Sequence, residues 1–124
     1  RNTGYFQRPG VFLNANNKMR SSREEIFGPV ASIIKVSDFE EAVATANDTE
    51  FGLSSAICTR SLYYAREFKR LSEAGMAMVN LPTAGVDYHV PFGGRKNSSY
   101  GSREQGRAAI DFYTTTKTTY SFAG

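Results

Sequence analysis

The middle of the chain alternates between strand-like and helix-like segments, and this alternation constrains the fold more than any other feature. Strands are predicted over residues 30–36, 53–59 and 76–79, where β-branched and other apolar residues cluster. Two amphipathic helices are predicted between them, the first over residues 38–48 and the second from Ser61. A strand-helix-strand-helix-strand order implies right-handed crossovers and a largely parallel sheet. We therefore predict an α/β fold.

Capping residues mark the ends of these helices. Asp38 offers a side-chain oxygen to the first turn, and Glu41 follows three positions later, which is the spacing of a capping box. Ser61 is predicted to cap the second helix. Gly75 is predicted to take the left-handed conformation that often follows a helix, and Asn80 to hydrogen-bond within its own turn.

The flanking regions are less regular. Residues 1–22 carry glycine and proline among short apolar runs, which predicts extended segments and turns. Residues 81–102 are rich in glycine, proline, asparagine and serine, so we predict a long structured loop that is functional or packed against something else. A short helix is predicted over residues 103–111. The first residue is arginine rather than methionine, which favours a chain processed or cut from a longer one.

The last part of the chain predicts a strand. Residues 112–122 consist largely of threonines and aromatic residues, which favour extended backbone. A terminal strand needs an edge to pair with, because unpaired backbone groups are costly where they are buried. Pairing with the chain's own sheet and pairing with another subunit are equally compatible with the sequence.

Composition argues against several classes of partner. The formal net charge is +3, but the basic residues are scattered, so we expect no nucleic-acid partner. No apolar run reaches the roughly 18 residues of a membrane span, and no signal-peptide pattern opens the chain. The chain has one cysteine, Cys58, and one histidine, His89, which excludes a disulfide framework and a zinc cluster within it. We therefore expect no bound metal and a location in the reducing cytoplasm. His89 is interpreted as part of the loop structure.

Five segments together resemble one enzyme family. They are GYFQRPGVF (residues 4–12), EEIFGPV (24–30), FGLSSAICT (51–59), GMAMVN (75–80) and PFGGRKNSSYGSRE (91–104). Their content, order and spacing resemble the aldehyde dehydrogenase superfamily. The sequence departs from that family at two positions. Ser99 stands where the family has a glycine, and Asn97 stands where a small residue is common. The sequence therefore does not predict the backbone path of this loop.

The resemblance implies a specific place and activity for the chain. Residues 1–111 would form the C-terminal part of the catalytic domain, and residues 112–124 an oligomerisation strand of a homodimer or homotetramer. Residues 80–96 and 103–120 look most like 2-oxoglutarate semialdehyde (2,5-dioxovalerate) dehydrogenases. The parent enzyme would oxidise a small semialdehyde to its acid through a cysteine thiohemiacetal, with NAD or NADP as the hydride acceptor.

Two residues are implied to bind the cofactor. Glu25 matches the carboxylate that holds the ribose on the nicotinamide side, and a carboxylate can accept hydrogen bonds from two neighbouring hydroxyls. Phe27 matches an aromatic residue beside the nicotinamide ring, which must be positioned for hydride transfer. The alternatives are a surface glutamate and a core phenylalanine. Gly28 and Pro29 are interpreted as the turn that orients both side chains.

The substrate side is implied by the loop that follows the third strand. Phe92 matches an aromatic residue lining the aldehyde tunnel, and its alternative is a structural plug beside two glycines. The expected substrate contacts in this loop are Thr83, Ala84, Gly85 and Val86. Arg103 and Glu104 are interpreted as an ion pair or a backbone anchor.

No catalytic residue is expected in this chain. Cys58 lies within a predicted strand, where a small buried hydrophobic residue is the usual role, and an activated thiolate would need a base or a cation beside it. The nucleophile, the base and the dinucleotide-binding domain are therefore expected upstream. Two other interpretations stay open: a non-catalytic binding or assembly piece, and a CoA-dependent member of the same superfamily. We also expect the isolated chain to be marginally stable or to self-associate.

Overall fold

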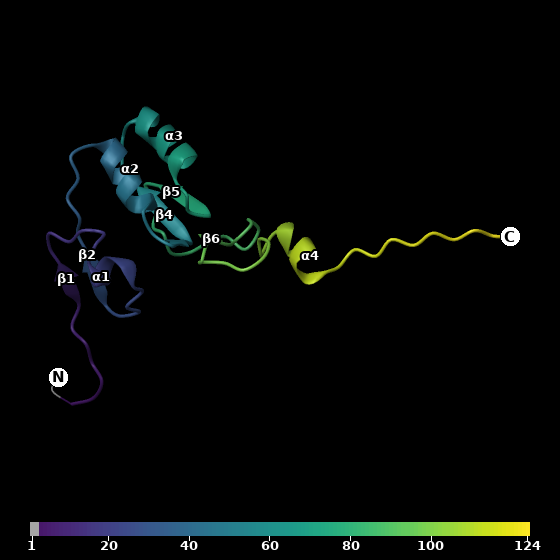
Figure 1. The fold of residues 1–124 in the computed structure, drawn as a ribbon, viewed down its shortest axis with the longest axis horizontal. Coiled ribbons are helices and arrows are strands. Elements are labelled where there is room, and N and C mark those ends of the chain that lie inside the picture. The colour runs from purple at the N-terminus through teal and green to yellow at the C-terminus, as the bar shows by residue number, and fades with distance from the viewer. Residues whose placement is uncertain (1–2) are drawn as a thin grey trace.

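A computed structural model describes residues 3–124, which combine short helices with small sheets (Figure 1). In chain order the elements are β1 (Gly10–Phe12), α1 (Arg20–Arg23), β2 (Val30–Ser32), α2 (Phe39–Asn47), β3 (Phe51–Gly52), β4 (Ser54–Ile57), α3 (Leu62–Leu71), β5 (Met76–Val79), β6 (Arg95–Lys96) and α4 (Ala108–Tyr113). The predicted α/β class is confirmed at this level.

The strands pair in twos rather than forming one sheet. β1 and β2 are parallel, β4 and β5 are parallel, and β3 and β6 are antiparallel. The prediction of one largely parallel sheet is therefore wrong for residues 3–124. The predicted strand over residues 30–36 is also too long, because β1 supplies hydrogen-bond partners only as far as Ile33, whose N–H donates to the carbonyl oxygen of Phe12.

The unit β4–α3–β5 positions the loop that carries Phe92. Its two strands pair in parallel from Ser54 opposite Met76, and α3 makes the connection. The hydroxyl of Ser61 accepts a hydrogen bond from the N–H of Tyr64 at 3.3 Å, which confirms the predicted N-cap. Phe68, on α3, is only 6% exposed and anchors this helix.

The N-terminus of α2 is capped as predicted, with one difference. Asp38 accepts a hydrogen bond from the N–H of Glu41 at 2.8 Å. The Glu41 carboxylate accepts from the hydroxyl and the N–H of Ser37, both at 2.7 Å, so the box closes one residue earlier than in the standard arrangement. These two hydrogen bonds hold the pKa of Glu41 below its ordinary value. The rings of Phe39 and Tyr64, 4.8 Å apart, connect α2 to α3.

Gly75 is required by a close approach of the backbone and not by a left-handed turn. α3 ends at Leu71, and Ser72 follows in extended conformation. Gly75 is not at positive φ, so that prediction is wrong. A Cβ atom on Gly75 would lie 2.1 Å from the carbonyl oxygen of Gly93 and 2.7 Å from the Cα of Gly94. The loop that passes over Gly75 therefore excludes a side chain there.

The C-terminal part differs most from the sequence prediction. The helix predicted over residues 103–111 is shifted to Ala108–Tyr113, because Glu104 is held in a backbone bridge instead. Residues 114–124 form no strand and extend away from the rest of the molecule (Figure 1). Pairing of this tail within its own sheet is wrong for residues 3–124, and its pairing with another subunit stays a prediction.

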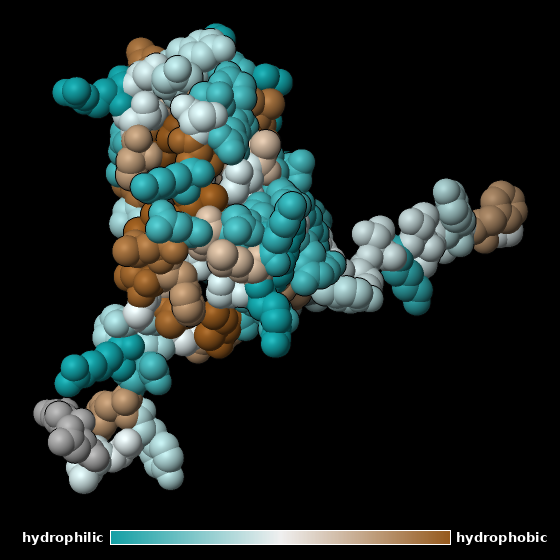
Figure 2. All heavy atoms as spheres, turned by 60° about the vertical axis from the view of Figure 1, so that its left-hand side comes forward, coloured by the Kyte–Doolittle hydropathy of each residue, from teal (hydrophilic) through white to brown (hydrophobic). Residues whose placement is uncertain are grey.

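The hydrophobic core is small for the length of the chain. Among residues 3–124 the buried side chains are those of Ala15, Val43, Phe68 and Ser72. The accessible surface is 10467 Å², whereas a compact monomer of 13.7 kDa exposes about 6,600 Å². Hydrophobic side chains are correspondingly visible on the surface in Figure 2. The chain therefore leaves uncovered an apolar surface that a compact domain would bury.

We expect the isolated chain to self-associate or to unfold without a sharp transition, because this exposed apolar surface favours association and the core supplies little cooperativity. Light scattering coupled to size exclusion, over a series of protein concentrations, measures the first effect. Denaturant unfolding measures the second. A monodisperse monomer with a steep cooperative transition would contradict the prediction.

Candidate cofactor and substrate site

Two adjacent glutamates follow α1, and they are held differently. Arg20 donates from Nε and Nη2 to the two carboxylate oxygens of Glu24, at 2.8 and 2.9 Å. This hydrogen bonding holds the pKa of Glu24 below its ordinary value. Glu25 is exposed, and its carboxylate makes no hydrogen bond or ion pair within residues 3–124. Of the two, Glu25 is therefore free to accept hydrogen bonds from a ligand.

Phe27 projects from the turn that follows. Its φ is 55° and its side chain is 91% exposed, so Phe27 is not a core residue within residues 3–124. A bulky residue in this left-handed region costs on the order of 1–3 kcal/mol. The N–H of Val30 donates to the carbonyl oxygen of Gly28 at 2.8 Å, which closes the turn. Phe27 lines a shallow recess of ≈ 130 Å³ together with these residues.

A wider polar groove of ≈ 580 Å³ adjoins Glu25. The ends of α1 and α2 line it, together with the start of β4, the residues before β5 and residues 96–98. The hydroxyl of Ser22, buried in this region, has no hydrogen-bond partner within residues 3–124. Ligands of parallel sheets usually bind at the carboxyl ends of the strands. This groove opens at the amino ends of β4 and β5, so it does not have the position of a substrate tunnel.

Phe92 is fixed by its backbone. Its N–H donates to the carbonyl oxygen of Glu104 at 2.7 Å, and the N–H of Glu104 donates back at 2.8 Å. Arg103 donates from Nη1 to the carbonyl oxygen of Gly94 at 2.6 Å, so the backbone-anchor interpretation of Arg103 is confirmed. Residues 103 and 104 make no ion pair with each other in the part of the chain described here. The Phe92 side chain is half-buried.

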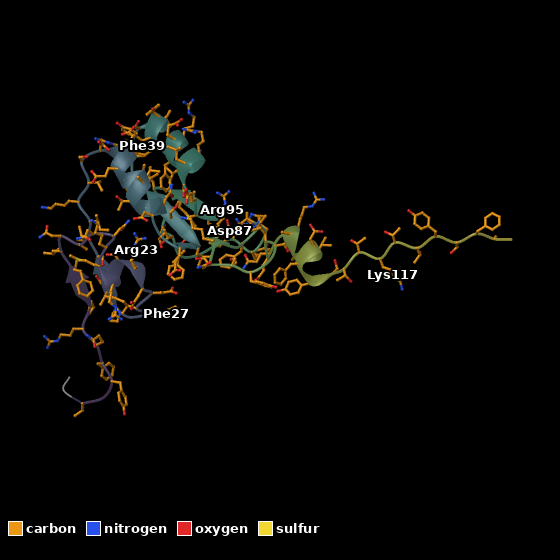
Figure 3. All side chains as sticks on the ribbon, in the orientation of Figure 1. Arg23, Phe27, Phe39, Asp87, Arg95 and Lys117 are labelled. Carbon is orange, nitrogen blue, oxygen red and sulfur yellow. The ribbon has the colours of Figure 1, made fainter. Side chains whose placement is uncertain are left out.

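The loop of expected substrate contacts is largely exposed. Thr83, Ala84 and Gly85 are exposed, and Val86 is half-buried. Gly85 has φ of 85° and open space where a Cβ would lie. Neither this loop nor Phe92 lines the groove or the recess described above. Figure 3 shows Phe27 and Asp87, next to this loop, well apart. Residues 3–124 alone therefore do not bring the cofactor and substrate residues into one cavity.

Ser98 and Ser99 each accept a hydrogen bond from the backbone N–H of a glycine. Ser99 accepts a hydrogen bond from the N–H of Gly94 at 2.6 Å, so the unexpected hydroxyl has a partner. Ser98 accepts one from the N–H of Gly52 at 2.8 Å, which connects the loop to β3. These two side-chain hydroxyls thus hold the loop around residues 97–99, whose path the sequence alone does not predict.

Cys58 and Asn80 lie at the carboxyl ends of β4 and β5. Cys58 is exposed just after β4, so the prediction of a buried residue within a strand is wrong. The side chain of Asn80 accepts from the N–H of Thr59 at 2.8 Å and donates to its carbonyl oxygen at 2.8 Å. It connects neighbouring strand ends and not its own turn, because the parallel pairing of Ile57 with Val79 brings the segment after β4 beside Asn80. That Cys58 is not the nucleophile stays a prediction.

The C-terminal end of α2 is the site of polar contacts that the sequence does not predict. Lys96 donates from Nζ to the carbonyl oxygens of Asn47 and Thr49, at 2.5 and 3.0 Å. Arg23 pairs from Nη2 with the Asp48 carboxylate at 2.7 Å. Cations in these positions complement the exposed carbonyls of a helix end. The partners lie 25 to 49 residues apart, so no local spacing could have revealed them.

Within residues 3–124, no three histidine, cysteine or acidic side chains gather in a way that could hold a metal ion. None of the helices described is long and apolar enough to cross a bilayer.

Comparison with known proteins decides the family. Residues 1–119 match the aldehyde dehydrogenase family. The chain belongs to that family. The resemblance inferred from its five segments is thereby confirmed. An alpha-ketoglutarate semialdehyde dehydrogenase of Haloferax volcanii is 50% identical over 119 residues, which are 95% of this chain and 25% of that protein. The alpha-ketoglutaric semialdehyde dehydrogenase of Bacillus subtilis is 46% identical over 117 residues, or 94% of this chain and 24% of that one.

Solved aldehyde dehydrogenase structures share the fold. An indole-3-acetaldehyde dehydrogenase complexed with NAD⁺ superposes with a TM-score of 0.81 at 43% identity, covering 88% of this chain and 22% of the other. The aldehyde dehydrogenase KauB of Pseudomonas aeruginosa gives a TM-score of 0.81 at 44% identity, with the same coverage of 88% and 22%. This chain thus spans about a quarter of the length of the curated relatives it matches.

Proposed function

We propose that this chain is the C-terminal part of the catalytic domain of an NAD(P)-dependent aldehyde dehydrogenase, and that the whole enzyme oxidises a semialdehyde to its carboxylic acid. The observation that carries the proposal is the pair of glutamates after α1. Arg20 donates hydrogen bonds to both carboxylate oxygens of Glu24. Glu25, in contrast, is exposed and unpaired within residues 3–124, and it lies two residues before the exposed ring of Phe27. A free carboxylate beside an exposed aromatic ring suits a ribose and the flat ring attached to it.

The residues present fit such a cofactor. When bound, a nicotinamide dinucleotide accepts the hydride that leaves the aldehyde carbon. Glu25 would hold the ribose through its hydroxyls, and Phe27 would limit the movement of the ring without enclosing it. The choice between NAD and NADP depends on residues that contact the 2′ position, which we assign to the part of the enzyme outside this chain.

On the substrate side, we propose that Phe92 and residues 83–86 form part of the tunnel wall. The backbone bridge to Glu104 and the Arg103 anchor hold Phe92 in place, while residues 83–85 are exposed and available to a substrate. The identity of up to 50% with semialdehyde dehydrogenases supports 2-oxoglutarate semialdehyde as the substrate. The nucleophile that captures the aldehyde is assigned outside this chain.

An aldehyde panel on the full-length protein tests this function. NAD and NADP are each supplied with and without CoA, and the product is identified by mass spectrometry. We expect the highest kcat/KM for 2-oxoglutarate semialdehyde, with the free acid as product and no requirement for CoA. Turnover that depends strictly on CoA would favour the acyl-transfer alternative. A native product of only this length, without turnover, would favour a non-catalytic piece.

A further inference from the structure

The two halves of the proposed site belong to different parts of the chain. Glu25 and Phe27 lie in residues 3–36, the part with β1, α1 and β2. Phe92 lies between β5 and β6, in the part built on α2, α3 and β3–β6. The extensive packing lies within each part: β1 packs with β2 in the first, whereas α2 with α3, α3 with β5, β4 with β5 and β3 with β6 pack in the second. The relative position of the halves therefore depends on contacts other than these.

Among the residues that the structure describes, five hydrogen bonds connect the first part to the second, and these five reach the end of α2. Asn17 donates from Nδ2 to the carbonyl oxygen of Thr45 at 2.9 Å, and to the carbonyl and carboxylate oxygens of Asp48 at 3.3 and 3.0 Å. Arg23 donates to the same carbonyl and carboxylate of Asp48, both at 2.7 Å. Arg23 Nε also donates to the carbonyl oxygen of Asn17, which joins the two donors. The last residue of α1 is thereby fixed to the cap of α2.

The substrate side is fixed to the same helix end from another direction. Lys96 reaches the carbonyl oxygens of Asn47 and Thr49, and its Nζ lies 2.6 Å from the Glu73 carboxylate. Its backbone is at φ of 51°, an uncommon conformation for a residue other than glycine. Lys96 follows Phe92 by four residues, and Arg23 precedes Phe27 by four.

We propose that the C-terminal end of α2, residues 45–49, is a junction that sets the position of Glu25 and Phe27 relative to Phe92. Arg23 is the positioning residue on the cofactor side, and Lys96 is the positioning residue on the substrate side. The inference rests on the proposed function for its catalytic consequence. A displacement of about 1 Å between reacting groups can lower a rate by about 100-fold, so such a junction matters even though it touches neither ligand.

The charges at the junction support this arrangement. The hydrogen bond from Arg23, with a further one from Asn17, holds the pKa of Asp48 below its ordinary value, so its carboxylate is ionised at neutral pH. The Arg23 and Asp48 side chains are 41% and 56% exposed, and an exposed pair of this kind contributes little to global stability. Loss of Arg23 is therefore expected to change geometry more than folding.

Arg23→Met in the full-length protein tests the junction by two measurements. Hydrogen–deuterium exchange of the ligand-free protein is expected to rise in residues 24–32 and to stay unchanged in β4 and β5. Steady-state kinetics are expected to show about a tenfold to 100-fold lower kcat/KM for the dinucleotide, with the aldehyde KM within about twofold. Arg23→Lys is expected to recover part of the loss, because it keeps the charge but not the fork of donors.

Arg70→Met is the matched control, because Arg70 makes an equally short ion pair with Glu67 that stays within α3. Lys96→Met is the reciprocal variant and is expected to raise the aldehyde KM instead. Equal exchange in residues 24–32 for Arg23→Met and Arg70→Met would overturn the junction, whether or not the enzyme turns over. If the unaltered protein oxidises no aldehyde, the proposed function fails, while the exchange measurement still decides whether the junction exists.

Discussion

Replacing Gly75 with alanine is expected to destabilise the full-length protein by about 3 kcal/mol or more, which is the upper end of the range for overpacking. The added Cβ would lie 2.1 Å from the carbonyl oxygen of Gly93 and 2.7 Å from the Cα of Gly94. Both are backbone atoms, so no flexible side chain can move away to make room. The loop itself would have to shift, and Phe92 would shift with it. We therefore expect a lower denaturation midpoint together with a raised aldehyde KM.

Gly10→Ala is the control for this prediction. A Cβ on Gly10 would meet the Cγ1 of Val30 at 3.7 Å, which is an ordinary van der Waals contact, and the residue is not at positive φ. Its free energy of unfolding is expected to change by no more than about 0.5 kcal/mol, the usual range of a surface substitution. Urea unfolding of both variants in parallel gives the comparison. Equal midpoints for Gly75→Ala and Gly10→Ala would show that the loop does not approach Gly75 in this way.

Gly75 also shows what a sequence can and cannot predict. The caps at Asp38 and Ser61 were predicted correctly, because donor and acceptor lie within three residues of each other. The reason for Gly75 lies 18 residues along the chain, in a loop whose path no periodicity describes. The strand and tail predictions failed for a related reason. Threonine-rich and β-branched segments favour extended backbone, but a strand forms only where another segment offers an edge.

In the candidate site too, the sequence predicts local features but not contacts between distant segments. The EEIFGPV segment predicts Glu25 and Phe27 as cofactor residues, and its choice of Glu25 over Glu24 rests on the family resemblance. Which of the two carboxylates is unpaired is a separate question. That answer was within reach, because Arg20 and Glu24 stand at the i,i+4 spacing of a helical ion pair. The contacts of Arg23 and Lys96 at the end of α2 were beyond reach, since they join segments brought together only by the fold. Local chemistry is thus readable from sequence, and relative placement is not.

Glu25→Gln in the full-length enzyme is expected to lower kcat/KM for NAD(P) by about tenfold to 150-fold, since a hydrogen bond to a charged group contributes about 1.5–3 kcal/mol. The amide keeps the size of the side chain and one acceptor oxygen, but it loses the charge and the second acceptor. The aldehyde KM is expected to change little, because Glu25 lines the groove, whereas neither Phe92 nor residues 83–86 line it. Initial rates over a matrix of dinucleotide and aldehyde concentrations separate the two effects.

Glu24→Gln distinguishes the assigned role from a general loss of negative charge. Both variants remove one carboxylate from adjacent positions, so their long-range electrostatic effects are nearly equal. Glu24 already accepts two hydrogen bonds from Arg20, and this exposed pair is worth at most about 1 kcal/mol. We therefore expect less than about a fivefold change in kcat/KM for Glu24→Gln. If the two variants lose activity equally, the free carboxylate of Glu25 is not the ribose ligand, and the charge of the segment as a whole becomes the better explanation.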